Sequence, residues 1–189
     1  MIVDLDLSDR IVDLVAEGFD LAIRVGVLGD SSLIARKVAD VHMAVCAAPS
    51  LIDERGEPDH PDALRDWPGL CYTGSERPDL WRYRLPDGTA GSVAVKVRML
   101  ANNGPLLCEA SAAGYGVVLQ PSFHLYDAVA AGALVPILQD CTWPEIAVHI
   151  VYPQTRHLTA RARAFIDFAR GRIGDEAYWE ALFEGARSR

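Results

Sequence analysis

The stretch of chain from residue 102 to residue 172 alternates helix-like and strand-like segments, and this alternation is the strongest constraint on the fold. Alternating apolar residues and apolar runs predict strands at 116–120, 134–138 and 146–152. Helices are expected before, between and after these strands: one starts at Asn102-Asn103-Gly104-Pro105, one is ended by Gly132 and one is capped by Thr159. Repeated exchange between the two kinds of element is typical of α/β proteins.

The first 48 residues fit the same class. We expect a strand at 2–6, a helix that Ser8 caps and Gly18 ends, and a strand at 19–25. A strand, a helix and a strand in so short a space predict a parallel pair joined by a right-handed crossover. The apolar stretch 33–48 is too long for one ordinary strand, so it predicts two strands that meet at 38–41.

The middle of the chain is less regular. Pro49 and Pro61 predict the first turns of two short helices, and a strand is expected at 70–73. Residues 74–91 indicate an irregular excursion or a hairpin, and the alternation of Val93, Val95 and Val97 predicts one strand. The tail after Gly174 is compatible with one more amphipathic helix.

The overall charge argues against a nucleic-acid-binding chain. There are 26 acidic and 18 basic residues, a net charge of −8, and this sign is wrong for neutralising phosphates. No apolar stretch approaches the roughly 18 residues of a membrane helix, and no signal peptide pattern follows Met1. We therefore expect a cytoplasmic protein that does not engage membranes.

Local signatures of catalysis and metal binding are absent from the sequence. The four cysteines (Cys46, Cys71, Cys108 and Cys141) form no CxxC pair, and the five histidines form no HExxH motif. No serine lies in a GxSxG elbow. We expect no catalytic residues, no metal and no cofactor.

Polar residues at helix starts are the remaining candidates for a binding site. Asn102 and Asn103 begin a helix after a strand, where free N–H groups suit a carboxylate. Pro121, Ser122 and Phe123 combine a hydroxyl with an aromatic ring at a second helix start. A plain N-cap explains both places equally well. Arg24, on a strand, is a further candidate for pairing with an anionic ligand, although solvent exposure would also explain it.

Several runs of the chain together resemble one family. They are 7–26 (LSDRIVDLVAEGFDLAIRVG), 30–36 (DSSLIAR), 45–49 (VCAAP), 101–104 (ANNG), 112–117 (AAGYGV), 119–121 (LQP), 132–136 (GALVP), 151–153 (VYP) and 156–168. In this order they resemble the effector-binding, or substrate-binding, domain of LysR-type transcriptional regulators. The resemblance covers nearly the whole chain to about Arg172.

The resemblance implies a fold like that of type 2 periplasmic binding proteins, with two nested α/β lobes, two crossovers and a ligand cleft between the lobes. Lobe I is expected at 1–40 plus 143–175, lobe II at 41–142, and a C-terminal tail at 176–189. Family members begin with a helix-turn-helix and an additional strand and helix, which we expect to be missing here.

The resemblance also implies a function and a set of site residues. The expected effector contacts are Asn102, Asn103, Pro121, Ser122, Phe123, Arg24, Gly26 and Ser31. The expected partners are a small, anionic effector and further copies of the chain in a homodimer or higher homo-oligomer. DNA is expected to bind only through a helix-turn-helix domain that this chain lacks. A free-standing solute-binding protein and an enzyme of the same fold are the alternatives.

Overall fold

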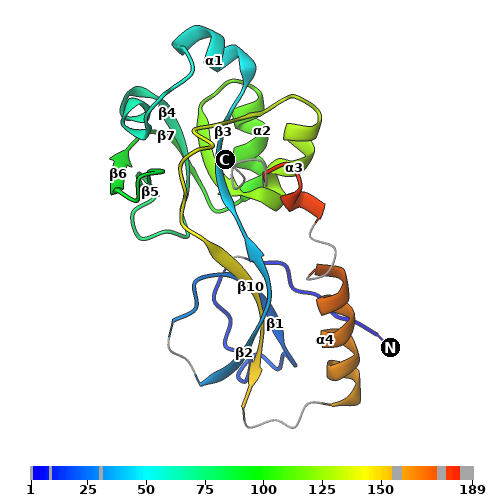
Figure 1. Cartoon of the computed structure of the whole chain (residues 1–189). Helices are drawn as coiled ribbons and strands as arrows, with labels where there is room; N and C mark the ends of the chain where they lie inside the picture. Colours follow the sequence, from blue (N-terminus) through cyan, green and yellow to red (C-terminus); the bar gives the residue numbers. More distant parts are fainter. Residues whose placement is uncertain (1, 9, 30–31, 155–158, 174–177, 184–189) are drawn as a thin grey trace. The chain divides into compact units, whose positions relative to one another are not determined.

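The computed structural model describes residues 2–8, 10–29, 32–154, 159–173 and 178–183 (Figure 1). The chain divides into two compact units. Unit 1 comprises Met1–Val41 and Ile146–Tyr178, and unit 2 comprises His42–Glu145 and Trp179–Arg189. The chain therefore passes from one unit to the other three times, and the third passage lies near its C-terminal end.

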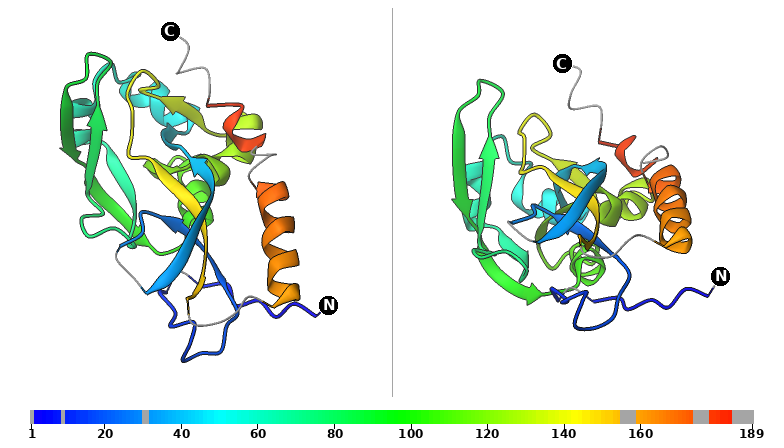
Figure 2. Two further views of the ribbon diagram at one scale, coloured as in Figure 1. Left: turned by 60° about the horizontal axis from the view of Figure 1, so that its bottom comes forward. Right: turned by 90° about the horizontal axis from the view of Figure 1, so that it is seen from below.

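Unit 1 is built on a three-stranded antiparallel sheet. Its strands in spatial order are β1 (Ala22–Gly26), β10 (Ile146–Pro153) and β2 (Leu33–Val41). Helix α4 (Ala160–Ile173) runs alongside this sheet (Figures 1 and 2). Ile150 and Tyr152 of β10 and Ile166 and Ala169 of α4 form the buried cluster between them. The burial of one apolar face of α4 therefore holds this helix against the sheet.

The start of α4 confirms a predicted cap. The Oγ1 atom of Thr159 accepts a hydrogen bond from the backbone N–H of Ala162 at 3.1 Å. This bond satisfies one of the N–H groups that a helix leaves without a partner in its first turn.

The predictions for residues 2–25 are wrong in two respects. Residues 2–8 and 10–21 form no helix or strand beyond a turn at 14–18, where the Oδ1 atom of Asp13 accepts hydrogen bonds from Val15 and Ala16. Strand β1 pairs antiparallel with β10, so no parallel unit is formed. A short amphipathic helix needs a surface on which to bury its apolar face, yet Ile11 is 86 % exposed and Leu14 alone in this stretch is buried.

Unit 2 contains a five-stranded mixed sheet. The strands in spatial order are β7 (Lys96–Ala101), β4 (Pro68–Tyr72), β8 (Val117–Pro121), β3 (Met43–Ala47) and β9 (Val135–Ile137). The first three are parallel to one another, and β3 is antiparallel to both β8 and β9. The longer helices of this unit are α1 (Pro49–Arg55), α2 (Gly104–Ala112) and α3 (Ser122–Ala130), and η1 (Pro61–Asp66) is a 3-10 helix.

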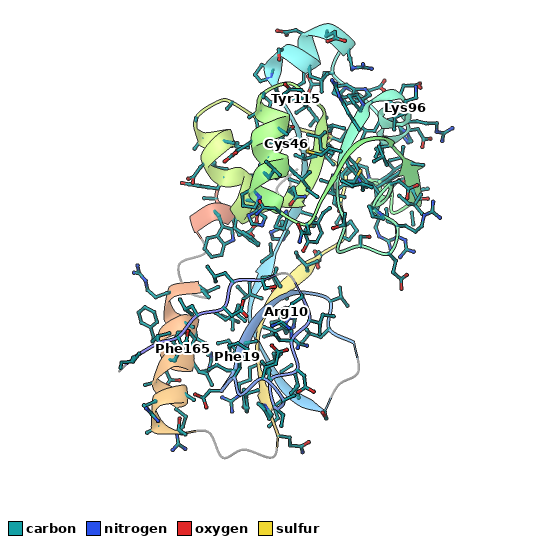
Figure 3. The ribbon with its side chains drawn as sticks, turned by 180° about the vertical axis from the view of Figure 1, so that it is seen from behind. Arg10, Phe19, Cys46, Lys96, Tyr115 and Phe165 are labelled. Atoms are coloured by element: carbon teal, nitrogen blue, oxygen red, sulfur yellow. The ribbon has the colours of Figure 1, made fainter. Side chains whose placement is uncertain are left out.

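Both faces of this sheet are buried. Neighbouring residues of one strand join different clusters: Val117 lies in the cluster with Leu64 and Trp81, and Val118 lies in the cluster with Leu107. Cys46, labelled in Figure 3, lies in the interior of unit 2 in the second cluster. Burial on both faces explains why these strands are apolar without strict alternation.

Two predictions about the middle of the chain are resolved by long-range pairing. The stretch 33–48 does form two strands, β2 and β3, separated at His42. The alternating valines do not form one strand, because the chain changes partners at Val95. Strand β6 (Ala90–Ala94) forms a hairpin with β5 (Leu80–Arg84), while β7 pairs with β4 in the main sheet. The backbone N–H groups on either side of this change bond to different segments, that of Val95 to Asp79 and that of Lys96 to Trp67.

The tail of the chain forms a shorter element than expected. A single 3-10 turn, η2 (Tyr178–Glu180), is followed by a turn to residue 183. Residues 174–177 and 184–189 lie outside the described part of the chain.

Candidate functional site

Two helices of unit 2 begin at the same edge of the sheet. Strands β7 and β8 both run parallel to β4, so their carboxyl ends point in one direction, and α2 and α3 start directly after them. Strand β3 begins at this edge, because Met43 is opposite Pro121. Crevices outside the carboxyl ends of strands are the usual ligand sites of open α/β sheets. The helix starts therefore define the candidate site.

Asn103 caps α2, as the sequence predicts. Its Oδ1 atom accepts a hydrogen bond from the backbone N–H of Leu106 at 2.9 Å, and Pro105 occupies the first turn. The preceding Asn102 is exposed. Both asparagines thus lie at the edge where the predicted site is expected, and one of them uses its side-chain oxygen within the chain.

The start of α2 lies directly against β8 and α3. A Cβ atom at Gly104 would be 2.6 Å from Cδ2 of His124 and 2.9 Å from Oε1 of Gln120. Gln120 is 2 % exposed, although it follows three apolar residues in its strand. The start of α2 therefore packs against polar side chains of β8 and α3. The single polar residue in an apolar strand is the sequence signal for this place.

The start of α3 is occupied by a residue from the end of the chain. Ser122 is fully buried, and its hydroxyl donates to Oε1 of Glu180 at 2.7 Å. His42 adds two donors to the same carboxylate: its backbone N–H lies 3.3 Å from Oε1, and Nδ1 lies 2.5 Å from Oε2. The backbone N–H of Ser122 in turn donates to the carbonyl of His42 at 2.8 Å.

Phe123 and Pro121 complete the predicted group at this helix start. The ring of Phe123 contacts that of His124 at a centroid distance of 4.4 Å and meets Trp179 edge-on at 6.3 Å. Pro121 is the N-cap residue of α3 and contributes no side-chain hydrogen bond. Sequence reasoning did not predict His42, His124 or Glu180 for this place. His42 and Glu180 are bonded to each other across 138 positions of the chain, so no local pattern joins them.

The remaining candidates, Arg24, Gly26 and Ser31, belong to unit 1. The Nη2 atom of Arg24 donates to the backbone carbonyl of Val12 at 3.1 Å. Gly26 ends β1 with a φ of +141°, a conformation that favours glycine. Ser31 lies outside the described residues. A part for these three residues in ligand binding stays a prediction.

Metal binding and thiol chemistry require particular arrangements of side chains in the described part of the chain. No group of three or more His, Cys, Asp or Glu side chains there is arranged to hold a metal ion. Burial raises the pKa of the Cys71 thiol to about 11 and that of Cys108 to about 12. At neutral pH these two thiols are therefore protonated and poor nucleophiles. Among the same described residues, no helix has both the length and the apolar character to cross a membrane.

Comparison with known proteins assigns the family. A model described as the LysR substrate binding domain matches residues 2–174. The chain belongs to the LysR substrate-binding domain family. It is 32% identical over 166 residues to an HTH-type transcriptional regulator of Escherichia coli, DmlR, covering 87% of this chain and 53% of that protein. An HTH-type transcriptional repressor of Pseudomonas aeruginosa is 35% identical over 167 residues, covering 87% of this chain and 52% of the repressor.

Solved structures of LysR-type regulators share the fold. The full-length virulence activator AphB of Vibrio cholerae superposes with a TM-score of 0.76 at 27% identity, covering 89% of this chain and 57% of AphB. The regulatory domain of CrgA from Neisseria meningitidis gives 0.73 at 26% identity, covering 85% of this chain and 78% of that one. These likenesses confirm the predicted α/β class, with the architecture of type 2 periplasmic binding proteins. The LysR-family chain spans about half the length of the curated relatives it matches.

Proposed function

We propose that this LysR-family domain senses a small anionic metabolite at the edge of unit 2 where α2 and α3 begin. The supporting observation is that two helices start at the same edge of the sheet, at the carboxyl ends of β7 and β8, which both run parallel to the β4 strand between them. The first turn of a helix presents N–H groups and a partial positive charge, both of which favour an anion. Asn102 and Asn103 would orient the ligand at α2, and Ser122 and Phe123 would do so at α3.

The chemistry of the α3 start favours a carboxylate. One carboxylate, that of Glu180, accepts hydrogen bonds there from the Ser122 hydroxyl and from two donors of His42. Charge-assisted hydrogen bonds of this kind are stronger than those between neutral groups. A carboxylate-bearing effector would use the same donors, while its remaining part would contact Phe123 and the α2 start.

In a complete regulator, the domain would couple effector binding to DNA binding. An effector that binds one arrangement of the protein more tightly shifts the population toward it, and the DNA-binding parts respond through that shift. We propose that DNA is contacted by a helix-turn-helix part, that the domain associates with further copies of itself, and that it works in the cytoplasm without turnover of the effector. The relatives named above are all transcriptional regulators, which supports a regulator over a free-standing solute-binding protein or an enzyme.

A thermal-shift screen of mono- and dicarboxylates tests the effector site. A true effector should raise the melting temperature of the wild-type chain, and Asn103→Leu should abolish the shift. Asn103→Ser is the matched variant, because serine keeps the N-cap but lacks the asparagine amide. It therefore distinguishes the effect of losing the cap from the effect of losing a ligand contact. Glu76→Gln, an exposed carboxylate of unit 2, is the control that should bind as wild type does. Undiminished binding by Asn103→Leu would overturn the site.

A gel-shift experiment tests whether this chain binds DNA by itself. The chain carries a net charge of −8, so it should not retard promoter DNA at moderate salt. Specific retardation by this chain alone would contradict the proposal that a separate part of the regulator contacts DNA.

A further inference from the structure

The last described residues of the chain pack against unit 2. We call residues 179–183 the C-terminal segment. It begins in η2, and the backbone N–H of Phe183 closes the following turn on the carbonyl of Glu180 at 2.8 Å. The ring of Phe183 joins the buried cluster that contains Leu107 and Leu125. The segment is therefore held by an apolar contact at its far end.

Its other two anchors lie on residues that the sequence assigns to the effector site. Trp179 meets the ring of Phe123 edge-on, with an interplanar angle of 79°. Glu180 accepts the hydroxyl hydrogen of Ser122. The segment thus contacts two neighbouring members of the predicted site.

The burial of Glu180 shows that this contact is more than surface packing. Glutamate is rarely buried unless it is paired, yet Glu180 is only 8 % exposed. A buried carboxylate is unfavourable without hydrogen-bond donors. Here the Ser122 hydroxyl at the start of α3, and the backbone N–H and ring of His42 between β2 and β3, supply them.

We propose that the C-terminal segment is a built-in competitor of the effector, with the Glu180 carboxylate standing where an effector carboxylate would bind. This inference rests on the function proposed above. The reason for competition is stoichiometric, because the hydroxyl of Ser122 has one hydrogen to donate. While Glu180 holds it, a ligand carboxylate has to do without it, and the apparent affinity for the ligand is the intrinsic affinity multiplied by the fraction of chains in which the segment is released.

The competition would also connect the site to the rest of the chain. Residues 174–177 join the C-terminal segment, which packs on unit 2, to α4 of unit 1. Release of the segment by an effector would therefore free the part of the chain that follows α4 from its contacts with unit 2.

A chemical-rescue experiment tests the competition without knowledge of the effector. Glu180→Ala removes the internal carboxylate and leaves the donors of Ser122 and His42 in place. Propionate, which carries a carboxylate on a two-carbon alkyl chain as the whole glutamate side chain does, should then raise the melting temperature of this variant saturably. The half-maximal concentration should be about tenfold or more below that for the wild-type chain, because no internal competitor remains.

Three controls make the rescue specific. Propionamide, which is neutral, should not replace propionate, and the double variant Ser122→Ala/Glu180→Ala should lose the effect. Glu109→Ala, which removes an exposed carboxylate of α2, should respond as the wild type does. If Glu180→Ala fails to fold, Glu180→Gln serves in its place, because its amide oxygen still accepts a hydrogen bond but more weakly than a carboxylate.

Tryptophan fluorescence supplies an independent readout of release. Trp67, Trp81 and Trp143 are each no more than 5 % exposed in the core of unit 2, whereas Trp179 is only half-buried. Acrylamide should therefore quench the fluorescence of Glu180→Ala more strongly than that of the wild type, and it should quench Glu109→Ala as it does the wild type.

Two outcomes would overturn the inference. One is an equal response of the wild type and Glu180→Ala to propionate, and the other is no response of a folded Glu180→Ala. A metabolite that binds the wild type and is lost in Asn103→Leu would show in either case that the proposed function stands and only the competition fails.

Discussion

Single residues set how closely the strands and helices of unit 2 approach one another. Gly116 precedes β8, and its carbonyl accepts a hydrogen bond from the buried hydroxyl of Ser111 at 2.7 Å. A Cβ atom at this position would be 2.3 Å from the backbone oxygen of Pro68 and 3.0 Å from the side chain of Leu70. Because the nearest atom belongs to the backbone of a neighbouring strand, a side-chain rotation cannot relieve the contact.

Gly116→Ala should therefore destabilise the protein. We expect a loss of about 1–3 kcal/mol in the free energy of unfolding, the usual effect of overpacking, measured by urea denaturation. The matched variant is Gly171→Ala in α4, where an added Cβ atom meets nothing within 4 Å. That change should stabilise the protein by up to about 1 kcal/mol, since alanine favours a helix over glycine. A loss of similar size in both variants would contradict the packing argument.

At the scale of elements, the stretch of residues 2–21 shows how far a local pattern depends on its partners. The apolar spacing of Ile11, Leu14 and Val15 predicts a helix, but residues 10–21, all of which the structure describes, form a turn held by Asp13 and no helix. The Nη1 and Nη2 atoms of Arg10, which is labelled in Figure 3, donate hydrogen bonds to the two carboxylate oxygens of Glu17 across this turn. Leu14 is 1 % exposed, whereas Ile11 and Val15 are exposed. One apolar contact and an ion pair thus take the place of the predicted helix.

Two truncations separate the buried residue from its exposed neighbour. Leu14→Ala should lower the free energy of unfolding by about 2–5 kcal/mol, because it leaves a cavity in unit 1. Ile11→Ala should change it by no more than about 0.5 kcal/mol, as expected for an exposed position. Thermal and urea unfolding of both variants provide the measurement. A large loss on Ile11→Ala would show that the predicted helix forms in solution.

On the scale of the whole molecule, each unit has its own apolar interior. The cluster of unit 1 contains Ile150 and Ile166, and the two clusters of unit 2 contain, among others, Leu64 and Leu107. None of the described clusters draws its buried residues from both units. Separate cores allow a protein to open in separate cooperative parts.

Hydrogen exchange should reveal this division. Ile166→Ala should speed amide exchange in β10 and α4, and Leu107→Ala should speed it in α2 and β8. Each substitution removes about 2–5 kcal/mol of packing from one core, so its effect should concentrate in its own unit. If either variant accelerated exchange equally in both units, they would unfold as one cooperative body.

The sequence by itself determined the elements whose signals are local. The caps at Asn103 and Thr159 bond to N–H groups three residues away, and Gly114 and Gly132 adopt the positive φ that ends the preceding helices. Because both partners of such contacts lie within one turn, their residue types alone predict them. The helix starts at Asn103 and Ser122 are visible in the pattern in the same way, as polar residues after a strand, whereas their part in effector binding stays a prediction.

Only the tertiary structure decided which distant segments meet. The antiparallel pairing of β1 with β10, the change of partner at Val95 and the contact of Ser122 with Glu180 all join residues far apart in the chain. Local periodicity shows that a segment has an apolar face or a polar end, but it does not say what will cover that face or satisfy that end. Whether the hydroxyl of Ser122 is open to an effector or held by the chain's own carboxylate is therefore a property of the folded molecule.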